Sequence, residues 1–264
     1  MSRLKYIDAL KGFAIIFVVI GHVANGYLNL GTTDSLYIYT HKVATSFHMP
    51  LFFAVSAFLF SRAYFAEDGR VKQEKLKIQI INLIWIYIIF GVALWTLKAL
   101  VFSSFVNSQL SVLDLLLIPF KPFDIYWYLY ILILYYIVFS RKCLINFRMT
   151  RILMFSLVFA ISSYWIPETW PFGIKRFMYY LPLFSLGCVL SQRVELLDSK
   201  KWILLIPPLL LLFIVFWNHE LPFNSIRFVN LAIGGVLLSA CFVYSSNSRF
   251  WEKTKYCCLL AKEA

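Results

Sequence analysis

The sequence predicts an all-α protein, a polytopic bundle of about eight transmembrane helices. Its 264 residues are 61% hydrophobic and only 14% charged, whereas about a quarter of the residues in soluble domains are charged. The mean hydropathy is +0.75. Apolar runs recur along the chain, several close to the roughly 20 residues that cross a bilayer. Lys and Arg recur in the short segments between these runs, as expected of membrane proteins.

The first apolar run, residues 9–28, is entered through charged residues and contains His22 near its far end. It lacks the small-residue cleavage site of a signal peptide, so we expect it to remain as a span. An ionisable group inside a span is costly and suggests a functional site. At about 100° per residue, Asp8, Lys11 and His22 fall on one helical face. Lys11 and His22 would lie about 16 Å apart along the axis.

The second span is expected to begin near Phe47 and to end near Phe60. Pro50 would then lie in its first turn, where proline is tolerated. His48 would lie at the mouth of this helix, and residues 29–46, which include His41, would form a polar loop.

Six further spans are expected, at residues 78–101, 124–140, 152–166, 176–191, 202–217 and 227–245. A short apolar or interfacial segment at 113–120 is closed by Pro119 and Pro122. Tyr126-Trp-Tyr128 opens the next span with the aromatic side chains typical of a membrane interface. The predicted organisation is one membrane domain, residues 1–245, followed by a polar tail, residues 246–264.

The distribution of Lys and Arg predicts the orientation. With a cytoplasmic N-terminus, 19 of the 25 Lys and Arg residues fall on the cytoplasmic side and six on the outer side. This is the positive-inside pattern. The net charge of +12 therefore indicates contact with a lipid bilayer. It does not indicate nucleic-acid binding, because the basic residues do not cluster with exposed stacking aromatics. The five cysteines show no metal-ligand or disulfide spacing, so no metal is expected.

Two stretches resemble the integral-membrane acyltransferase-3 family. Tyr6-Ile-Asp-Ala-Leu-Lys-Gly-Phe-Ala14, with Val19-Ile-Gly-His22, is similar to the first span of that family. Residues 47–60, which begin Phe-His-Met-Pro, are similar to its second span, although Ala57 stands where a glycine is usual. Weaker similarities lie at Trp127-Tyr-Leu129 and at residues 181–187. The hallmark of the family is a basic residue, ten residues and a histidine, and the spacing from Lys11 to His22 matches it.

The resemblance implies a multi-pass enzyme of the bacterial cytoplasmic (inner) membrane. Such enzymes move acyl groups, often acetyl from acetyl-CoA, onto hydroxyls of extracytoplasmic sugars or lipid-linked glycans. The family usually has about ten spans, so we expect its C-terminal spans to be missing from this chain. A truncated, inactive relative is therefore one alternative. A polytopic transporter is another; it would have symmetric halves and paired broken helices, which the sequence does not show.

Acyl transfer from a thioester to a hydroxyl requires a base for the hydroxyl proton, and histidine suits this role near neutral pH. His22 would be that base, or would accept the acyl group itself before passing it on. Lys11 would bind an anionic phosphate of the donor, and Asp8 would orient Lys11 or neutralise it. Alternatively, His22 forms a hydrogen bond between helices, and Asp8 and Lys11 only anchor the helix at the interface.

Further basic residues lie on the predicted cytoplasmic side. Arg62, Lys75 and Lys77 are candidates for contacts with the phosphates of CoA. The alternative is a basic segment that lies on anionic lipid.

Four residues are candidates for the acceptor. His48 would bind or activate it, unless it only caps the helix beside Pro50. Ser56 would also contact it, unless it is a helix-packing residue. Lys175 and Arg176 lie on the predicted outer side, against the general charge bias, and would meet an anionic glycan or lipid carrier.

Overall fold

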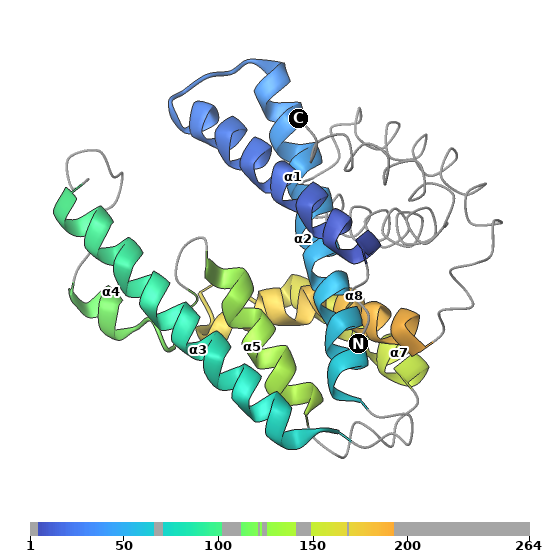
Figure 1. Cartoon of the computed structure of the whole chain (residues 1–264). Helices are drawn as coiled ribbons and strands as arrows, with labels where there is room; N and C mark the ends of the chain where they lie inside the picture. Colours follow the sequence, from blue (N-terminus) through green and yellow to red (C-terminus); the bar gives the residue numbers. More distant parts are fainter. Residues whose placement is uncertain are drawn as a thin grey trace, which may run out of the picture. The chain divides into compact units, whose positions relative to one another are not determined.

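The structure, a computed structural model, describes residues 5–65, 71–101, 112–120, 122, 126–140, 149–167 and 169–192. All regular elements in these ranges are helices (Figure 1). Extended pairing is limited there to an isolated antiparallel bridge between Phe65 and Val71. The predicted all-α class is therefore confirmed for the described residues. The predicted spans at 202–217 and 227–245 and the predicted tail lie outside them.

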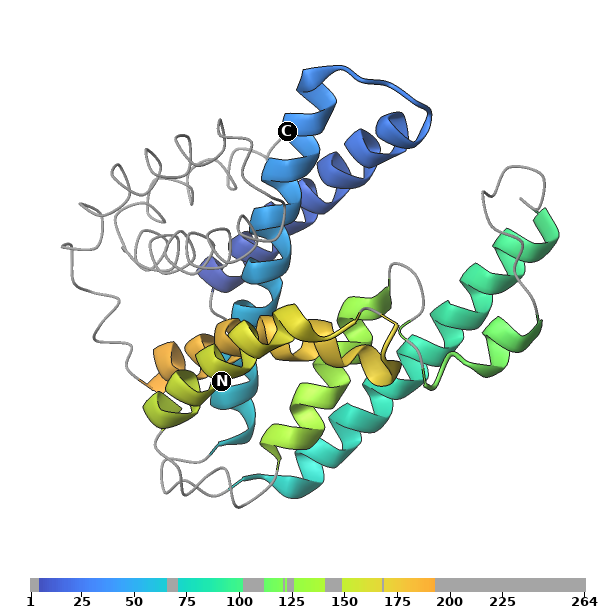
Figure 2. The same cartoon turned by 180° about the vertical axis from the view of Figure 1, so that it is seen from behind.

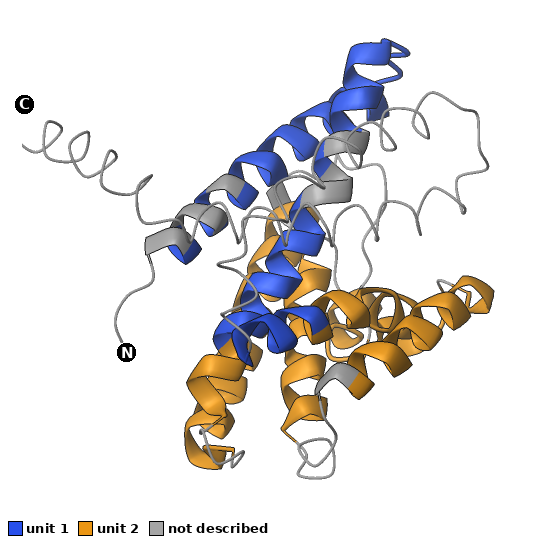
Figure 3. Cartoon of the chain, turned by 90° about the vertical axis from the view of Figure 1, so that its right-hand side faces the viewer, with its two compact units in different colours: residues 1–59, 186–264 blue, residues 60–185 orange. Residues whose placement is uncertain are grey.

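The chain forms two compact units (Figure 3). The first contains residues 1–59 and 186–264, and the second contains residues 60–185.

In the first unit, α1 (Lys5–Asn29) and the first part of α2 (Ser35–Tyr64) form an antiparallel hairpin (Figures 1 and 2). Gly31 ends α1 with a φ of +86°, a conformation that glycine adopts without steric cost. The side chain of Asp34 then caps α2 by accepting a hydrogen bond of 2.9 Å from the amide of Leu36. The rings of Tyr27 and Tyr37 stack 4.6 Å apart beside this turn.

The predicted start of the second span near Phe47 is wrong, because α2 begins at Ser35. Residues 35–46 are thus helical rather than a loop, and His41 belongs to the helix. Pro50 lies in the helix interior, where it leaves the carbonyl of Ser46 without its usual i+4 donor. Prolines are tolerated inside transmembrane helices because neighbouring groups satisfy the freed carbonyls. His48 is therefore not at the mouth of the helix and does not cap it.

In the second unit, α3 (Gln73–Thr96) continues as a π-helical segment, Leu97–Val101, and lies beside α5 (Trp127–Phe139) (Figure 2). Gln73, at the start of α3, donates a hydrogen bond of 3.0 Å from Nε2 to the carbonyl of Ser140, just after α5. Near the other end, the rings of Phe90 and Tyr126 are 6.1 Å apart. The two helices are therefore antiparallel, as alternating spans require.

The segment around α4 (Val112–Leu116) is tied to this pair of helices. Tyr87 donates a hydrogen bond of 2.9 Å to the carbonyl of Ile118, and Tyr130 donates one of 3.2 Å to that of Pro119. Gly91 leaves room for Ile118, whose side-chain carbons would lie 3.6 Å from a Cβ at that position. The expected short apolar segment is thus a short helix with a fixed turn after it.

The remaining described elements are α7 (Met149–Ser162), the 3-10 turns Ser163–Trp165 and Pro171–Gly173, and α8 (Ile174–Gln192). The ring of Phe184 lies 4.6 Å from that of Tyr135 and 4.9 Å from that of Phe139. The ring centroids of Phe60 and Phe184 are 5.7 Å apart. The core of the second unit is therefore aromatic and centres on α5 and the adjacent part of α8.

Among the described residues, one helical stretch, Gln73–Ala99, is long and apolar enough to cross a membrane, with a hydropathy of 2.2. Shorter apolar helices lie at Ala14–Asn29, Trp127–Phe139 and Arg151–Trp165. Each of these four stretches overlaps a predicted span. The total of eight spans and the orientation stay predictions.

Candidate functional site

One face of α1 packs against its surroundings through residues seven positions apart. Ile7, Ala14 and Gly21 are buried along this face, and a spacing of seven residues returns to the same side of a helix. Lys11 lies close to this face, because residues four apart are neighbours on a helix. His22 follows Gly21 directly, about 100° around the helix. The predicted stripe of charged residues therefore runs along the edge of the buried face.

Gly21 is a point of close approach between α1 and α2. A Cβ at this position would lie 3.0 Å from the Cβ of Ala44 and 3.8 Å from Cε1 of His48. Small residues allow such close approaches between membrane helices. The glycine of the Val-Ile-Gly-His motif thus brings the backbone beside His22 close to the imidazole of His48.

Two histidines of α2 donate hydrogen bonds to backbone carbonyls at this contact. Nδ1 of His41 lies 3.1 Å from the carbonyl oxygen of Gly21, and Nδ1 of His48 pairs with the carbonyl oxygen of Ala44. A carbonyl oxygen only accepts, so Nδ1 carries the proton in both rings. In a neutral His48, Nε2 is then the basic nitrogen.

Three histidines, His22, His41 and His48, lie around the contact between α1 and α2. His48 is only 4% exposed and lies close enough to both other rings for their charges to interact with its own. His22 is exposed on α1 in the part of the chain that the structure describes. No group of three or more His, Cys, Asp or Glu residues in that part is arranged to hold a metal ion. Imidazoles transfer protons and act as nucleophiles, and these histidines have the side chains for either role.

Sequence reasoning gave no role to His41, which it placed in a loop. The spacing of His41, Ala44 and His48, at i, i+3 and i+7, contained the missing signal. These positions share one face of a helix, and that face meets Gly21.

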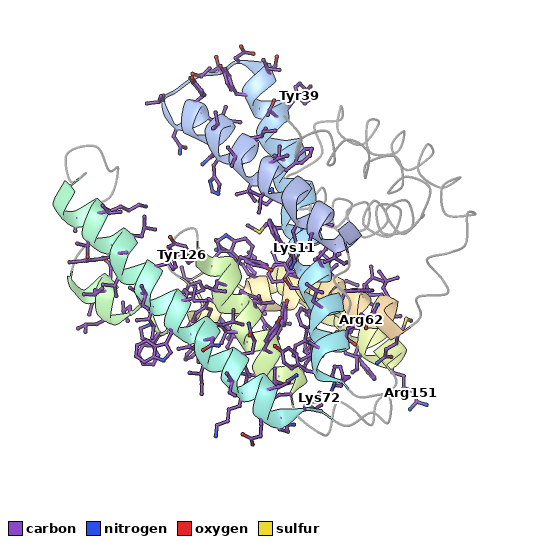
Figure 4. The ribbon with its side chains drawn as sticks, viewed as in Figure 1. Lys11, Tyr39, Arg62, Lys72, Tyr126 and Arg151 are labelled. Carbon is purple, nitrogen blue, oxygen red and sulfur yellow. The ribbon has the colours of Figure 1, made fainter. Side chains whose placement is uncertain are left out.

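Asp8 and Lys11 lie one turn apart on α1 and are both half-buried. Figure 4 shows Lys11 on the first half of α1 and Tyr39 near the start of α2. Because α1 is helical from Lys5 to Asn29, the helical phase on which the Asp8, Lys11 and His22 stripe was predicted is present. Their chemical roles stay predictions.

The last part of α8 in the first unit packs very closely on α2. A Cβ on Gly187 would overlap the carbonyl oxygen of Ala54 and would lie 2.8 Å from the Cβ of Ala57. Sγ of Cys188 lies 3.7 Å from the carbonyl oxygen of Ala57. Ser56 is half-buried beside this contact in sequence. The alanine in place of the family's usual glycine is thus accommodated opposite Gly187.

The other candidate residues belong to the second unit. Arg62 is half-buried in the last turn of α2, and Lys75 and Lys77 are exposed near the start of α3 (Figure 4 labels Arg62 and the neighbouring Lys72). Lys175 is half-buried near the start of α8. Arg176 is exposed, and its Cζ lies 4.8 Å from the ring centroid of Trp127.

Taken together, the described part of the chain defines a class: an all-helical protein with one helix long and apolar enough to cross a membrane, and with a basic residue and a histidine on one stripe of α1. Comparison with known proteins then gives the family. An acyltransferase domain model, that of the acyltransferase-3 family, matches residues 4–261. The chain belongs to this family, and the resemblance noted in its first two spans is confirmed.

A curated relative is the nodulation protein NolL of Mesorhizobium japonicum, which is 27% identical over 223 residues. The alignment covers 81% of this chain and 56% of the relative, so the chain spans a little over half the length of that protein. No solved structure matches the chain.

Proposed function

We propose that the chain is a multi-pass membrane O-acyltransferase of the bacterial cytoplasmic membrane. It moves an acetyl group from acetyl-CoA to a hydroxyl of an extracytoplasmic sugar or lipid-linked glycan. Membership in a family of acyltransferases supports the acyl transfer itself. The donor, the acceptor and the orientation with a cytoplasmic N-terminus belong to the proposal.

The observation that carries the proposal is the contact at Gly21. It joins the basic-x10-histidine motif of α1 to a buried histidine on α2. A histidine on each side of this contact suits a reaction in which one imidazole takes a proton from the acceptor hydroxyl and the other takes up or returns it.

Two routes fit these residues. In direct transfer, His22 takes the proton of the acceptor hydroxyl while the oxygen of that hydroxyl attacks the thioester carbonyl. The carbon–sulfur bond breaks, and the thiolate of CoA leaves and takes up a proton. In the covalent route, a ring nitrogen of His22 attacks first, releasing CoA, and the acceptor oxygen then takes the acetyl group from the imidazole. In either route, His48 holds the adjacent basic nitrogen and receives or returns a proton.

Lys11 serves the donor in this proposal. It lies about 16 Å along α1 from His22, and an ammonium binds a phosphate as a point charge. Asp8, one turn earlier, orients this ammonium. Arg62, Lys75 and Lys77 contribute further positive charge for the phosphates of CoA, and Ser56, Lys175 and Arg176 are retained as candidate acceptor contacts.

The test is acetyl transfer by the wild-type chain and by His22→Gln. Cells that express each protein are examined by mass spectrometry for O-acetyl groups on surface glycan, and the purified proteins are assayed with radiolabelled acetyl-CoA. We expect His22→Gln to lower kcat by about 10³-fold, within the range of positioned acid–base groups. The proposal fails if the wild type transfers no acetyl group or if His22→Gln transfers it normally.

Lys11→Gln separates donor binding from chemistry. We expect the KM for acetyl-CoA to rise about tenfold, equivalent to about 1.4 kcal/mol, with the KM for the acceptor unchanged. Lys11→Arg keeps the charge and is the matched control. An unchanged KM for acetyl-CoA in Lys11→Gln would remove Lys11 from the donor site.

A further inference from the structure

An arginine and two aromatic residues form a cluster in the second unit, at the start of α5 and the start of α8. Cζ of Arg176 lies 4.8 Å from the ring centroid of Trp127. The ring of Tyr180 lies 5.5 Å from that of Trp127, with 31° between their planes. Arg176 and Tyr180 are four residues apart, so they project from one face of α8. Figure 4 labels Tyr126, the residue directly before α5.

Trp127 and Trp95 are half-buried, whereas the other tryptophans of this unit that the structure describes are exposed. Trp85, Trp165 and Trp170 are 59%, 72% and 51% exposed, as expected of side chains at a membrane surface. Trp127 is half-buried and contacts two residues of α8, Arg176 and Tyr180. These contacts restrict its orientation before any ligand binds, which lowers the entropic cost of binding.

The turn before α8 fixes the position of Arg176. The amide of Phe172 donates a hydrogen bond of 3.0 Å to the carbonyl of Phe120. Phe172 has a φ of 60°, and a bulky residue at positive φ is strained. A Cβ on Gly173 would lie 2.7 Å from Cγ of Pro122. Backbone strain of this kind persists where the surroundings hold it and is concentrated at functional sites.

We propose that Trp127, Tyr180 and Arg176 bind the sugar ring of the acetyl acceptor. A pyranose has a face of C–H groups and a rim of hydroxyls. The C–H face stacks on the negative face of an aromatic ring, and the hydroxyls accept hydrogen bonds from the guanidinium of Arg176. Lys175, adjacent and half-buried, adds positive charge for a carboxylate or phosphate on the acceptor. This inference rests on the proposed function, because it assumes that the acceptor is a sugar.

The predicted topology agrees with this assignment. The start of the span at 124–140 and the start of the span at 176–191 are both predicted on the outer side, where an extracytoplasmic sugar would arrive. Arg176 and Trp127 come from these two starts and lie in contact. Tyr126 and Trp127, assigned from sequence to an aromatic belt, therefore have different surroundings: Tyr126 packs near Phe90, and Trp127 faces the arginine.

The experiment measures acceptor binding and transfer separately. The full chain is purified in an amine-oxide detergent, which has no sugar headgroup to compete. The acceptor is the de-O-acetylated surface polysaccharide of the cells that carry the gene, cut to short oligosaccharides. We expect Trp127→Ala to raise the KM for these oligosaccharides at least tenfold, with the KM for acetyl-CoA within twofold and most of kcat retained at saturating acceptor. Trp127→Phe should recover most of the binding, and Arg176→Gln should raise the acceptor KM about fivefold.

Trp165→Ala is the matched control, because Trp165 is also a tryptophan of this unit but is highly exposed; its acceptor KM should equal that of the wild type. If Trp127→Ala does not fold, Tyr180→Leu against Tyr180→Phe supplies the same comparison. An unchanged acceptor KM in the folded Trp127 or Tyr180 variants would overturn the inference while leaving the proposed function intact.

If the wild type transfers no acetyl group, the proposed function fails, and binding is measured by the change in intrinsic fluorescence. Saturable binding of the oligosaccharides that is lost in Trp127→Ala would still support the sugar site. Absence of binding to the wild type would overturn it. Binding of dihexanoyl-phosphatidylglycerol instead of the oligosaccharides, lost in the same variant, would assign the cluster to a lipid headgroup and would also overturn it.

Discussion

The α1–α2 hairpin and the α3–α5 pair with its aromatic core pack by opposite means. In the hairpin, small residues such as Gly21 and Ala44 let two backbones meet, and histidines bind carbonyls at that contact. In the second unit, rings around Phe184 fill the space between helices, and tyrosine hydroxyls donate hydrogen bonds to carbonyls of other segments, from Tyr87 to Ile118 and from Tyr135 to Phe177. Close backbone contact holds histidines against carbonyls in the hairpin, where we propose proton transfer, whereas the second unit offers aromatic rings, where we propose sugar binding.

The largest effect is expected where small-residue packing is tightest. Gly187→Ala would bring a Cβ into the carbonyl oxygen of Ala54 and within 2.8 Å of the Cβ of Ala57. Backbone cannot move aside as a flexible side chain does, so we expect a loss of about 3 kcal/mol in the free energy of unfolding. Thermal unfolding in detergent measures it.

Gly12→Ala is the matched control, because a Cβ there would meet nothing within 4 Å. Alanine should even stabilise α1, by up to about 1 kcal/mol. If both alanine variants unfold at the wild-type temperature, the α2–α8 contact at Gly187 is not close.

Gly21→Ala should disturb chemistry more than folding. Its Cβ would lie 3.0 Å from that of Ala44, a few tenths of an ångström too close, and the helices would separate beside His22 and His48. We expect a loss of about 1–2 kcal/mol in stability and a decrease of about tenfold in kcat for acetyl transfer, because small displacements of reacting groups are costly.

Ala44→Gly removes the opposing Cβ, so the double variant Gly21→Ala/Ala44→Gly should recover much of kcat. The two single variants and the double variant form a double-mutant cycle, and its coupling energy measures the interaction between residues 21 and 44. Simple additivity of the two substitutions would show that the α1–α2 approach at Gly21 does not set the activity.

His41→Leu should have a smaller effect. This substitution removes the group that donates a hydrogen bond of 3.1 Å to the carbonyl of Gly21. We therefore expect the free energy of unfolding to fall by about 1 kcal/mol and kcat to fall a fewfold. His41→Asn places an N–H near the position of Nδ1 and should restore most of both. Equal behaviour of the leucine and asparagine variants would mean that this hydrogen bond does not orient the site.

Much of the fold was predictable because apolar runs and helical spacing are local signals. The stripe from Asp8 to His22 could be placed because it lies within one helix, α1. The start of α2 could not be predicted, because polar residues in 35–46 interrupt the helical spacing of the apolar residues. Asp34 is nevertheless a recognisable helix cap. The contact of Arg176 with Trp127 joins residues far apart in sequence, and neither residue alone indicates a partner.

The smallest effects should come from the tyrosines that hold the segment after α4. Tyr87→Phe removes a buried hydrogen bond of 2.9 Å to Ile118, and Tyr130→Phe removes one of 3.2 Å to Pro119. We expect the free energy of unfolding to fall by about 1 kcal/mol in Tyr87→Phe and by about 0.5 kcal/mol in Tyr130→Phe, because the aromatic packing is kept. Hydrogen exchange should accelerate locally in residues 117–120, and Tyr27→Phe, in the other unit, should leave that exchange unchanged.

Because Phe120 also accepts the hydrogen bond from Phe172, loosening this segment should raise the acceptor KM slightly if Trp127 and Arg176 bind the sugar. Faster exchange with an unchanged acceptor KM would separate the rigidity of this segment from sugar binding.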